Sequence, residues 1–440
     1  MRTLLPLLFL LTLPAAAQRL GPTLQSGPMV GYSEMREVAL WVQTTAPATV
    51  RFEYYEADRP GTRYRTADYR TRREEGHTAT LIADQVLPGK RYRYELFIDN
   101  RRRTCDYPLE FQSQPLWQYR TDPPAFTFAL GSCHYVNEEA YDRPGEGYGG
   151  GYEIFGTIHE ARPDFMVWLG DNTYLRNADW NTRTGVYHRY THTRSLPEVQ
   201  PLLASTHHYA IWDDHDYGPN DSDRSFAQKE ITYEAFRDFW PNLNWDVTGT
   251  GGITGHFQWA DVEFFLLDDR YHRTPNNREA ADRDLLGEAQ IEWLIDALVS
   301  SQAPFKFVCI GGQVLNPAAV YENYATYPEE RADLLRLIRE NDIPGVIFLN
   351  GDRHHSELTV LKRRGTYPLY DITCSPLTAG THAPNNEGNY LQEENTLVSV
   401  RNFGLLTVSG PRRDRQLQIR ILDANGGEQW SRTIKASDLR

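Results

Sequence analysis

The sequence predicts an α/β domain preceded by a smaller β-sandwich, and two observations carry this prediction. In the N-terminal part of the chain, apolar and polar residues alternate with the period of two that half-buried antiparallel strands require. Beyond about residue 121, short apolar runs that resemble buried strands alternate with segments whose apolar residues recur at helical spacing. Alternation of this second kind is typical of layered α/β folds.

The bulk composition is that of an ordinary globular protein with room for two domains. The chain has 440 residues, of which 24% are charged and 40% hydrophobic. Its formal net charge of -13 argues against a long nucleic-acid partner, because such partners are bound largely by Lys and Arg that neutralise phosphates. A small phosphorylated substrate would need local positive charge, which bound metal ions can supply.

The first residues have the three parts of a secretory signal peptide. Arg2 precedes an apolar segment at residues 4–13, and three alanines at 15–17 precede the expected cleavage site. The apolar segment is too short to span a bilayer as a permanent helix, and no later stretch is long and apolar enough. We therefore expect residues 1–17 to direct Sec-type export, which predicts a secreted or periplasmic protein without a membrane span.

Residues 21–112 are expected to form the sandwich. Val38, Leu40 and Val42 alternate with polar or small residues, and the same alternation returns at residues 50–54. A turn at residues 87–89 leads into an aromatic strand, as in immunoglobulin- and fibronectin-like sandwiches. Nothing in this module indicates catalysis. Three prolines in the stretch that follows predict a linker before a second domain at residues 121–440.

In the second domain, five apolar runs end in possible metal ligands. The runs and the residues that follow them are 126–130 before Gly131-Ser132-Cys133-His134, 165–169 before Gly170-Asp171, 209–212 before Asp213-Asp214-His215-Asp216, 307–310 before Gly311-Gly312-Gln313, and 346–349 before Asn350-Gly351-Asp352-Arg353-His354. Open α/β sheets bind their ligands at the carboxyl ends of the strands. Packing alone does not require a ligand-type residue at five successive strand ends, so we expect a shared metal centre.

The residue types also indicate which metals fit. Asp171 lies three residues before Tyr174, close enough on a turn for a carboxylate and a phenolate to reach one ion. Tyr and Cys deprotonate only when a cation offsets the cost, so a phenolate and the Cys133 thiolate together favour ferric iron. A lone tyrosine after a strand is, however, more often a packing residue. Four cysteines in an exported chain also allow two disulfides as an alternative, although the strand-end position of Cys133 favours a ligand.

Two acidic segments indicate a second cation. Residues 213–216 hold three carboxylates and an imidazole, and such crowding costs repulsion unless a cation is bound. An exposed acidic loop that caps the next segment is the alternative. Asp352 and His354 are two residues apart, so their side chains point the same way if this segment is extended.

The order of these motifs resembles that of the PhoD-type alkaline phosphatases, a branch of the calcineurin-like metallophosphoesterase superfamily. The motifs are Gly-Ser-Cys-His, Leu-Gly-Asp-Asn-Thr-Tyr, Trp-Asp-Asp-His-Asp and Asn-Gly-Asp-Arg-His. The resemblance implies a four-layer α/β/β/α sandwich with iron and one or more calcium ions, or other divalent metals, at the sheet edge. The residues it implies are Cys133, Asp171, Tyr174 and His354 for the iron, Asp171, Asp214 and Asp352 for the second site, Gln313 as a further ligand and His215 as a catalytic residue beside the phosphate.

The resemblance implies hydrolysis of phosphate monoesters or diesters by a metal-activated hydroxide. The chain lacks His-Glu-x-x-His, Gly-x-Ser-x-Gly and Walker-type signatures, which argues against zincins, serine hydrolases and nucleoside triphosphatases. Two alternatives stay open at this point. One is a non-catalytic, calcium-binding surface protein, and the other is a phospholipase- or nuclease-like phosphodiesterase.

Overall fold

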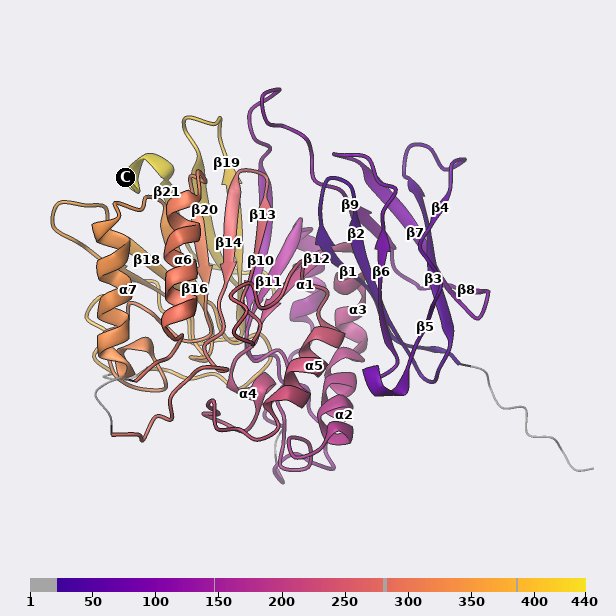
Figure 1. Cartoon of the computed structure of the whole chain (residues 1–440), viewed down its shortest axis with the longest axis horizontal. Coiled ribbons are helices and arrows are strands. Elements are labelled where there is room, and N and C mark those ends of the chain that lie inside the picture. The colour runs from indigo at the N-terminus through magenta and orange to yellow at the C-terminus, as the bar shows by residue number, and fades with distance from the viewer. Residues whose placement is uncertain (1–21, 146, 280–282, 385–386) are drawn as a thin grey trace, which may run out of the picture.

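The computed structural model describes residues 22–145, 147–279, 283–384 and 387–440. Two large β-sheets pack face to face with helices on their outer sides, and a smaller sheet completes an N-terminal sandwich (Figure 1). The predicted α/β/β/α arrangement, in which two sheets lie between helices and follow a β-sandwich, is therefore confirmed. The predicted signal peptide at residues 1–17 lies outside the described residues.

The first large sheet runs through both parts of the chain. Its strands, in order across the sheet, are β21 (Glu428–Lys435), β20 (Gln416–Asp423), β19 (Asn402–Ser409), β10 (Phe126–Gly131), β11 (Phe165–Leu169), β12 (His207–Ile211), β1 (Leu24–Ser33), β2 (Val38–Thr44) and β6 (Thr78–Ala83). Strands β10, β11 and β12 are parallel, so their carboxyl ends lie at one edge. Strand β1 joins β12 in parallel, with Val30 opposite His207. The sandwich thus shares a sheet with the second domain.

The second large sheet and the small sheet complete the β structure. In the second sheet the order is β13 (Gly255–Trp259), β14 (Val262–Leu266), β15 (Lys306–Cys309), β16 (Val346–Asn350), β18 (Leu369–Thr373) and β17 (Glu357–Leu361). The small sheet has the order β4 (Tyr64–Arg65), β3 (Thr49–Glu56), β7 (Arg91–Ile98) and β8 (Arg101–Arg103), with β5 (Tyr69–Arg70) on β3 and β9 (Glu110–Gln112) on β7. Strands β14, β15, β16 and β18 are parallel, so the second sheet also presents several carboxyl ends at one edge.

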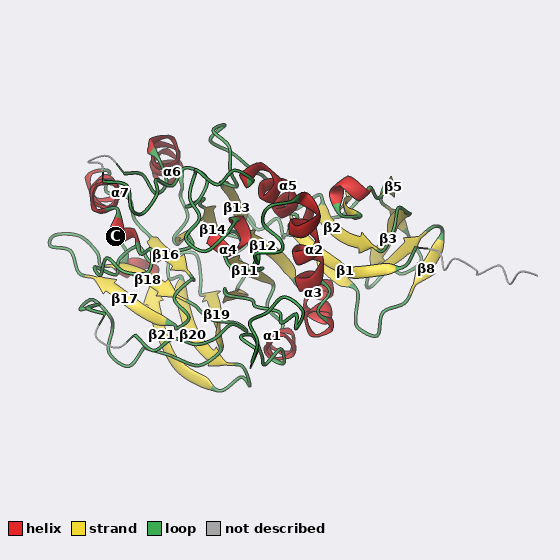
Figure 2. Cartoon of the chain, turned by 90° about the horizontal axis from the view of Figure 1, so that it is seen from below, coloured by secondary structure: helices red, strands yellow, loops and turns green. Residues whose placement is uncertain are grey.

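The helices cover the outer sides of the paired sheets. They are α1 (Ile154–Ala161), α2 (Arg183–Arg194), α3 (Gln200–Ser205), α4 (Asp214–Tyr217), α5 (Lys229–Phe239), α6 (Glu288–Ser300) and α7 (Pro328–Glu340). Helices α6 and α7 lie on one outer side, and α1 lies on the opposite one (Figure 2). None of the helices in the described ranges has the length and apolarity needed to cross a membrane.

The residues between the two predicted domains are packed against both. The side-chain amide of Gln114 donates to the backbone oxygens of Ser33 and Gln258 at 2.8 and 2.7 Å. Its side-chain oxygen accepts a hydrogen bond from the backbone N–H of Ala260. The boundaries at residues 112 and 121 stay predictions, but this stretch packs against both parts of the chain and is not a free linker.

A cluster of phenylalanines fills the space between the two large sheets. Phe128 stacks on Phe165 with 5.1 Å between ring centroids, and both belong to the first sheet. Their rings meet those of Phe264 and Phe307 from the second sheet, with Phe128 5.3 and 5.4 Å from the two centroids. All four side chains are fully buried. This cluster fixes the spacing of the two sheets and therefore the spacing of their strand ends.

Replacing Phe165 by alanine is expected to lower the free energy of unfolding by about 3–5 kcal/mol, because the surrounding rings cannot close the cavity. The measurement is urea denaturation followed by tryptophan fluorescence. The matched control is Tyr119→Ala, which removes a fully exposed aromatic ring and should change little. Equal stability of the two variants would show that the cluster does not hold the sheets together.

Candidate metal centre

The predicted ligands meet where strands of both sheets end. The loops after β10, β11 and β12 carry Cys133, Asp171 and Asp214, and the loop after β16 carries Asp352 and His354. In the view of Figure 1 this edge is the lower one, where α4 lies beneath the strands. Segments more than 200 residues apart in the chain are thus brought together by the parallel topology.

One group of side chains has the arrangement of a metal site. The ligand atoms of Cys133, Asp171 and His354 all lie within 4.8 Å of one another. The Tyr174 hydroxyl donates to the Asp171 carboxylate at 3.0 Å and lies 3.3 Å from Nε2 of His354. The four residues that the resemblance implies as iron ligands therefore surround one small volume.

A second group shares a residue with the first. Ligand atoms of Asp171, Asp214 and His215 also lie within 4.8 Å of one another. Asp171 belongs to both groups and could therefore contribute a ligand atom to each. Asp214 is shared in turn with a more exposed group that includes Asp221 and Glu322.

The side chains in these groups suit bound cations. Burial raises the pKa of the Asp171 carboxyl well above its usual range, and the neighbouring Cys133 and carboxylates raise it further. Burial also raises the pKa of the Cys133 thiol to about 12. Oδ1 of Asp214 and Nδ1 of His215 are buried and have no hydrogen-bond partner within the part of the chain that the structure describes. A bound metal would offset the free-energy cost of burying these charged and unpartnered groups, because it stabilises their deprotonated forms and binds their lone pairs. The donor set therefore fits a metal ion.

The backbone around the centre is strained in a consistent way. Cys133, Asp171, Asp352 and His354 have φ values of 57°, 52°, 65° and 57°. Residues other than glycine rarely adopt this left-handed region, and such strain persists where the surroundings enforce it, often at functional sites. The extended segment assumed for Asp352 and His354 is therefore wrong. Asp352 belongs to none of the ligand groups found among the described residues, although its backbone oxygen lies 3.6 Å from the Cys133 sulfur. Burial and the Asp214 carboxylate raise the pKa of Asp352 to about 7.

The acidic residues after β12 have three different roles. Asp213 caps α4 and accepts a hydrogen bond from Nε of Arg270 at 2.6 Å. Asp216 accepts the backbone N–H groups of Asn172 at 3.0 Å and of Thr173 at 3.2 Å, which ties the loop after β11 to the loop after β12. Among the described residues, Oδ2 of Asp213 and Oδ1 of Asp214 both lack a hydrogen-bond partner, but only Asp214 belongs to the ligand groups. All three carboxylates are buried, so the exposed acidic loop considered as an alternative is not what forms here.

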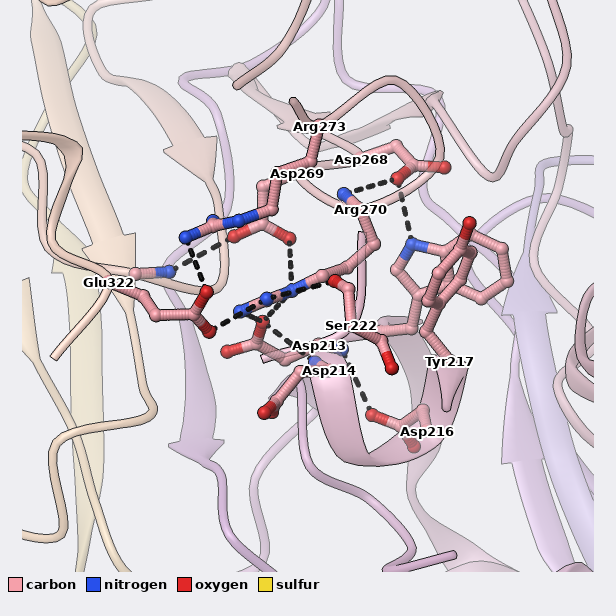
Figure 3. Close-up of polar contacts among 12 residues, drawn as sticks. Asp213, Asp214, Asp216, Tyr217, Ser222, Asp268, Asp269, Arg270, Arg273 and Glu322 are labelled. Carbon is pink, nitrogen blue, oxygen red and sulfur yellow. Dashed lines mark hydrogen bonds and ion pairs between the residues drawn. The ribbon is translucent and has the colours of Figure 1, made fainter. Parts of the chain in front are cut away.

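A buried arginine links the two sheets beside the centre (Figure 3). The Arg270 guanidinium pairs with Asp213, lies 3.7 Å from Asp269 and contacts Glu322 at 2.8 Å. Arg273 pairs with the other oxygen of Glu322. Sequence reasoning missed this network, although the charged residues that follow β14 mark another strand end at the same edge. Burial raises the pKa of Asp213 well above its usual range, and the Arg270 guanidinium opposes this shift. The pair holds Asp213 in place next to Asp214.

A model of the PhoD-like phosphatase family matches residues 128–413. The chain belongs to the PhoD-like phosphatase family. Residues 21–115 match a separate domain of unknown function. The family match covers every strand end that contributes to the centre.

Known relatives agree with the family and the fold. Alkaline phosphatase D of Bacillus subtilis (strain 168) is 22% identical over an alignment of 335 residues that covers 64% of this chain and 54% of that protein. The chain thus matches only about half the length of this curated relative. The structure of PhoD superposes with a TM-score of 0.76 at 17% identity, covering 95% of this chain and 91% of that one. The purple acid phosphatase PPD1 of yellow lupin gives 0.68 at 13% identity, covering 94% and 74%.

Gln313 does not share the surroundings of the other predicted ligands of this PhoD-like chain. Its side-chain oxygen accepts hydrogen bonds from Asn316 at 2.7 Å and from Arg353. Its amide nitrogen donates to Glu357 at 2.7 Å and to Thr373 at 2.8 Å. Both polar atoms are committed, so this geometry gives no support to Gln313 as a ligand and indicates that it braces the loop that carries Arg353.

The four cysteines are all unpaired. Cys133, Cys309 and Cys374 are buried and Cys105 is half-buried, and none of them forms a disulfide. The alternative of two bridges is therefore wrong for this structure. The Cys133 sulfur instead lies 3.6 Å from the Asp171 carboxylate and accepts a hydrogen bond from the Ser375 hydroxyl at 3.1 Å.

Replacing Arg270 by alanine is expected to destabilise the protein by about 3–5 kcal/mol, because it leaves buried carboxylates without their partner. The measurement is urea denaturation at neutral pH. The matched control is Arg336→Ala, which breaks exposed ion pairs on α7 and should cost no more than about 1 kcal/mol. If the Arg270 variant is as stable as the control, the network does not organise this edge.

Proposed function

We propose that this protein is a metal-dependent phosphoesterase that hydrolyses small phosphate monoesters or diesters. The observation that carries the proposal is the pair of adjacent ligand groups that share Asp171, in a chain of the PhoD-like phosphatase family. Adjacent cations suit phosphoryl transfer, because they clamp a phosphate between them. The full set of buried donors argues against the non-catalytic alternative, which would need oxygen ligands alone.

We further propose ferric iron for the group of Cys133, Asp171, Tyr174 and His354. Support comes from the donor types, because a thiolate and a phenolate are stabilised by a strongly Lewis-acidic ion. Calcium, or another hard divalent ion, is proposed on the side of Asp214 and Asp352, where oxygen donors dominate. When bound, such ions lower the pKa of a coordinated water and offset the charge of the phosphate.

His215 is the proposed catalytic residue. Its ring lies 4.3 Å from the Tyr174 ring, centroid to centroid, and its side chain belongs to the ligand group of Asp171 and Asp214. Its backbone N–H faces Asp171 at 3.4 Å, and its backbone oxygen accepts from Leu175. These contacts hold the imidazole beside the centre, where an N–H can bind a phosphate oxygen or deliver a proton to the leaving oxygen.

Export to a secreted or periplasmic location is also part of the proposal. Its support is the sequence pattern of residues 1–17, with a basic start, an apolar segment and small residues before the cleavage site. In that setting the expected partners are small phosphorylated substrates.

Removing the metals, or Asp171, should abolish hydrolysis. Loss of a hydrogen-bond partner outside the ligand sphere already costs 10- to 100-fold in metalloenzymes, so Asp171→Asn should cost about 100-fold or more. The measurement is turnover of p-nitrophenyl phosphate before and after chelation, with metal content determined for each sample. Asp333→Asn, an exposed change on α7, is the matched control. Undiminished turnover after both treatments would remove the proposal.

Tyr174→Phe should remove a visible charge-transfer absorption band if the phenolate binds ferric iron. The measurement is the absorption spectrum of protein purified without added metal, together with elemental analysis. Tyr135→Phe is the control, since its hydroxyl bonds to Asp142 at 2.6 Å and not to a ligand group. An iron-containing protein whose spectrum is the same in all three forms would contradict Tyr174 as a ligand.

A further inference from the structure

Arg176 lies beside the metal centre but is not part of it. Its guanidinium stacks on the Tyr135 ring, 4.2 Å from the centroid, and lies 5.4 Å from the centroid of the Tyr174 ring. The Tyr174 hydroxyl in turn bonds to Asp171, and the Tyr174 ring packs on His215. The arginine is thus one side chain away from the ligand groups.

The other arginines around the centre are held by carboxylates. Arg270 pairs with Asp213 and Glu322, Arg273 with Glu322, and Arg353 with Glu387. Each of the three guanidinium groups is almost fully buried, with 1% of its side chain exposed. These guanidinium groups are paired with carboxylates of the protein, which already balance their charge.

Arg176 differs from these arginines in its partner and its exposure. Its nearest carboxylate oxygen, Oδ1 of Asp142, is 4.0 Å away, and that oxygen already accepts the Tyr135 hydroxyl at 2.6 Å. In the described part of the chain no acceptor takes a hydrogen bond from the Arg176 guanidinium. About a fifth of the side chain, 22%, is exposed, so a ligand can reach it. The Arg176 fork is therefore oriented by an aromatic ring and still has its donors available.

An available guanidinium at this position suits a phosphate. Its planar fork matches two oxygens of one phosphate, and stacking on an aromatic ring limits the conformations it must give up on binding. A monoester carries up to two negative charges on its non-bridging oxygens, whereas a diester carries one. One extra positive charge therefore stabilises a bound monoester more than a bound diester.

We propose that Arg176 binds a non-bridging oxygen of the substrate phosphate and makes the centre selective for monoesters over diesters. The proposal rests on the phosphoesterase function proposed above. A purely structural role, in which Arg176 only packs on Tyr135, is the competing explanation. The two explanations predict different results, because a packing role would affect turnover of both ester classes alike, whereas a phosphate contact would affect monoesters more.

The test compares kcat/KM for p-nitrophenyl phosphate and for bis(p-nitrophenyl) phosphate in wild type, Arg176→Met and Arg176→Lys. Methionine keeps much of the apolar stem without the charge, and lysine keeps the charge without the fork. We expect Arg176→Met to lower monoester turnover at least about tenfold more than diester turnover. The ratio of monoester to diester turnover in Arg176→Lys should lie between those of wild type and Arg176→Met. Arg63→Met is the matched control, since Arg63 stacks on Tyr55 at 4.7 Å in the sandwich. It should leave both activities unchanged.

An unchanged ratio of monoester to diester turnover in Arg176→Met would overturn the proposal, whether both activities fall together or neither falls. Metal content of each variant separates this result from loss of the centre. Calorimetric binding of inorganic phosphate provides a second measurement, in which Arg176→Met should bind at least about tenfold more weakly. If wild type hydrolyses neither ester, the proposed function and the selectivity fail together. The phosphate contact is then judged by calorimetry alone, where equal affinity contradicts it.

Discussion

The arrangement of this edge follows from one constraint, which is that buried carboxylates need compensating positive charge or hydrogen bonds. Asp213 has Arg270, and Asp216 has backbone N–H groups from two loops. Asp171 accepts the Tyr174 hydroxyl, and burial raises its pKa well above the usual range. His215 and Arg270 lower the pKa of Asp214 despite its burial, while its Oδ1 has no hydrogen-bond partner among the described residues. Asp171, whose carboxylate lies next to the Cys133 thiol and His354, is therefore the carboxylate for which a bound cation would matter most.

The fold brings these groups together through the parallel strands. Parallel strands end at a common edge, and the phenylalanine cluster between the sheets holds the two edges in register. Four of the candidate ligands, Cys133, Asp171, Asp352 and His354, lie just beyond the strands in a left-handed backbone conformation. Asp216 holds the turn that follows Asp171 through backbone N–H groups, and Arg270 holds Asp213 next to Asp214.

Much of the centre was predictable because each ligand directly follows an apolar run. A run such as residues 165–169 is recognisable as a buried strand without knowledge of its neighbours, and parallel topology then places Asp171 at the shared edge. The roles within residues 213–216 were not predictable, because they depend on Arg270 and on loop N–H groups more than 40 residues away. The pairing of β1 with β12 also lacks a local signal, since it joins strands 177 positions apart at Val30 and His207. Gln313 stays a predicted ligand that the geometry does not support, because its amide is occupied by Asn316 in the same loop and by Arg353, Glu357 and Thr373 from other segments.

The central claim is that Asp171 lies between two cations, one of them also bound by the Cys133 sulfur. Anomalous diffraction from crystals of the protein as purified, collected on both sides of the iron absorption edge, tests this claim most directly. The account predicts an iron peak in contact with Cys133, Tyr174 and His354, and a second cation about 3.5–4 Å away beside Asp214. A single ion bound elsewhere, or a Cys133 sulfur outside every coordination sphere, would contradict it.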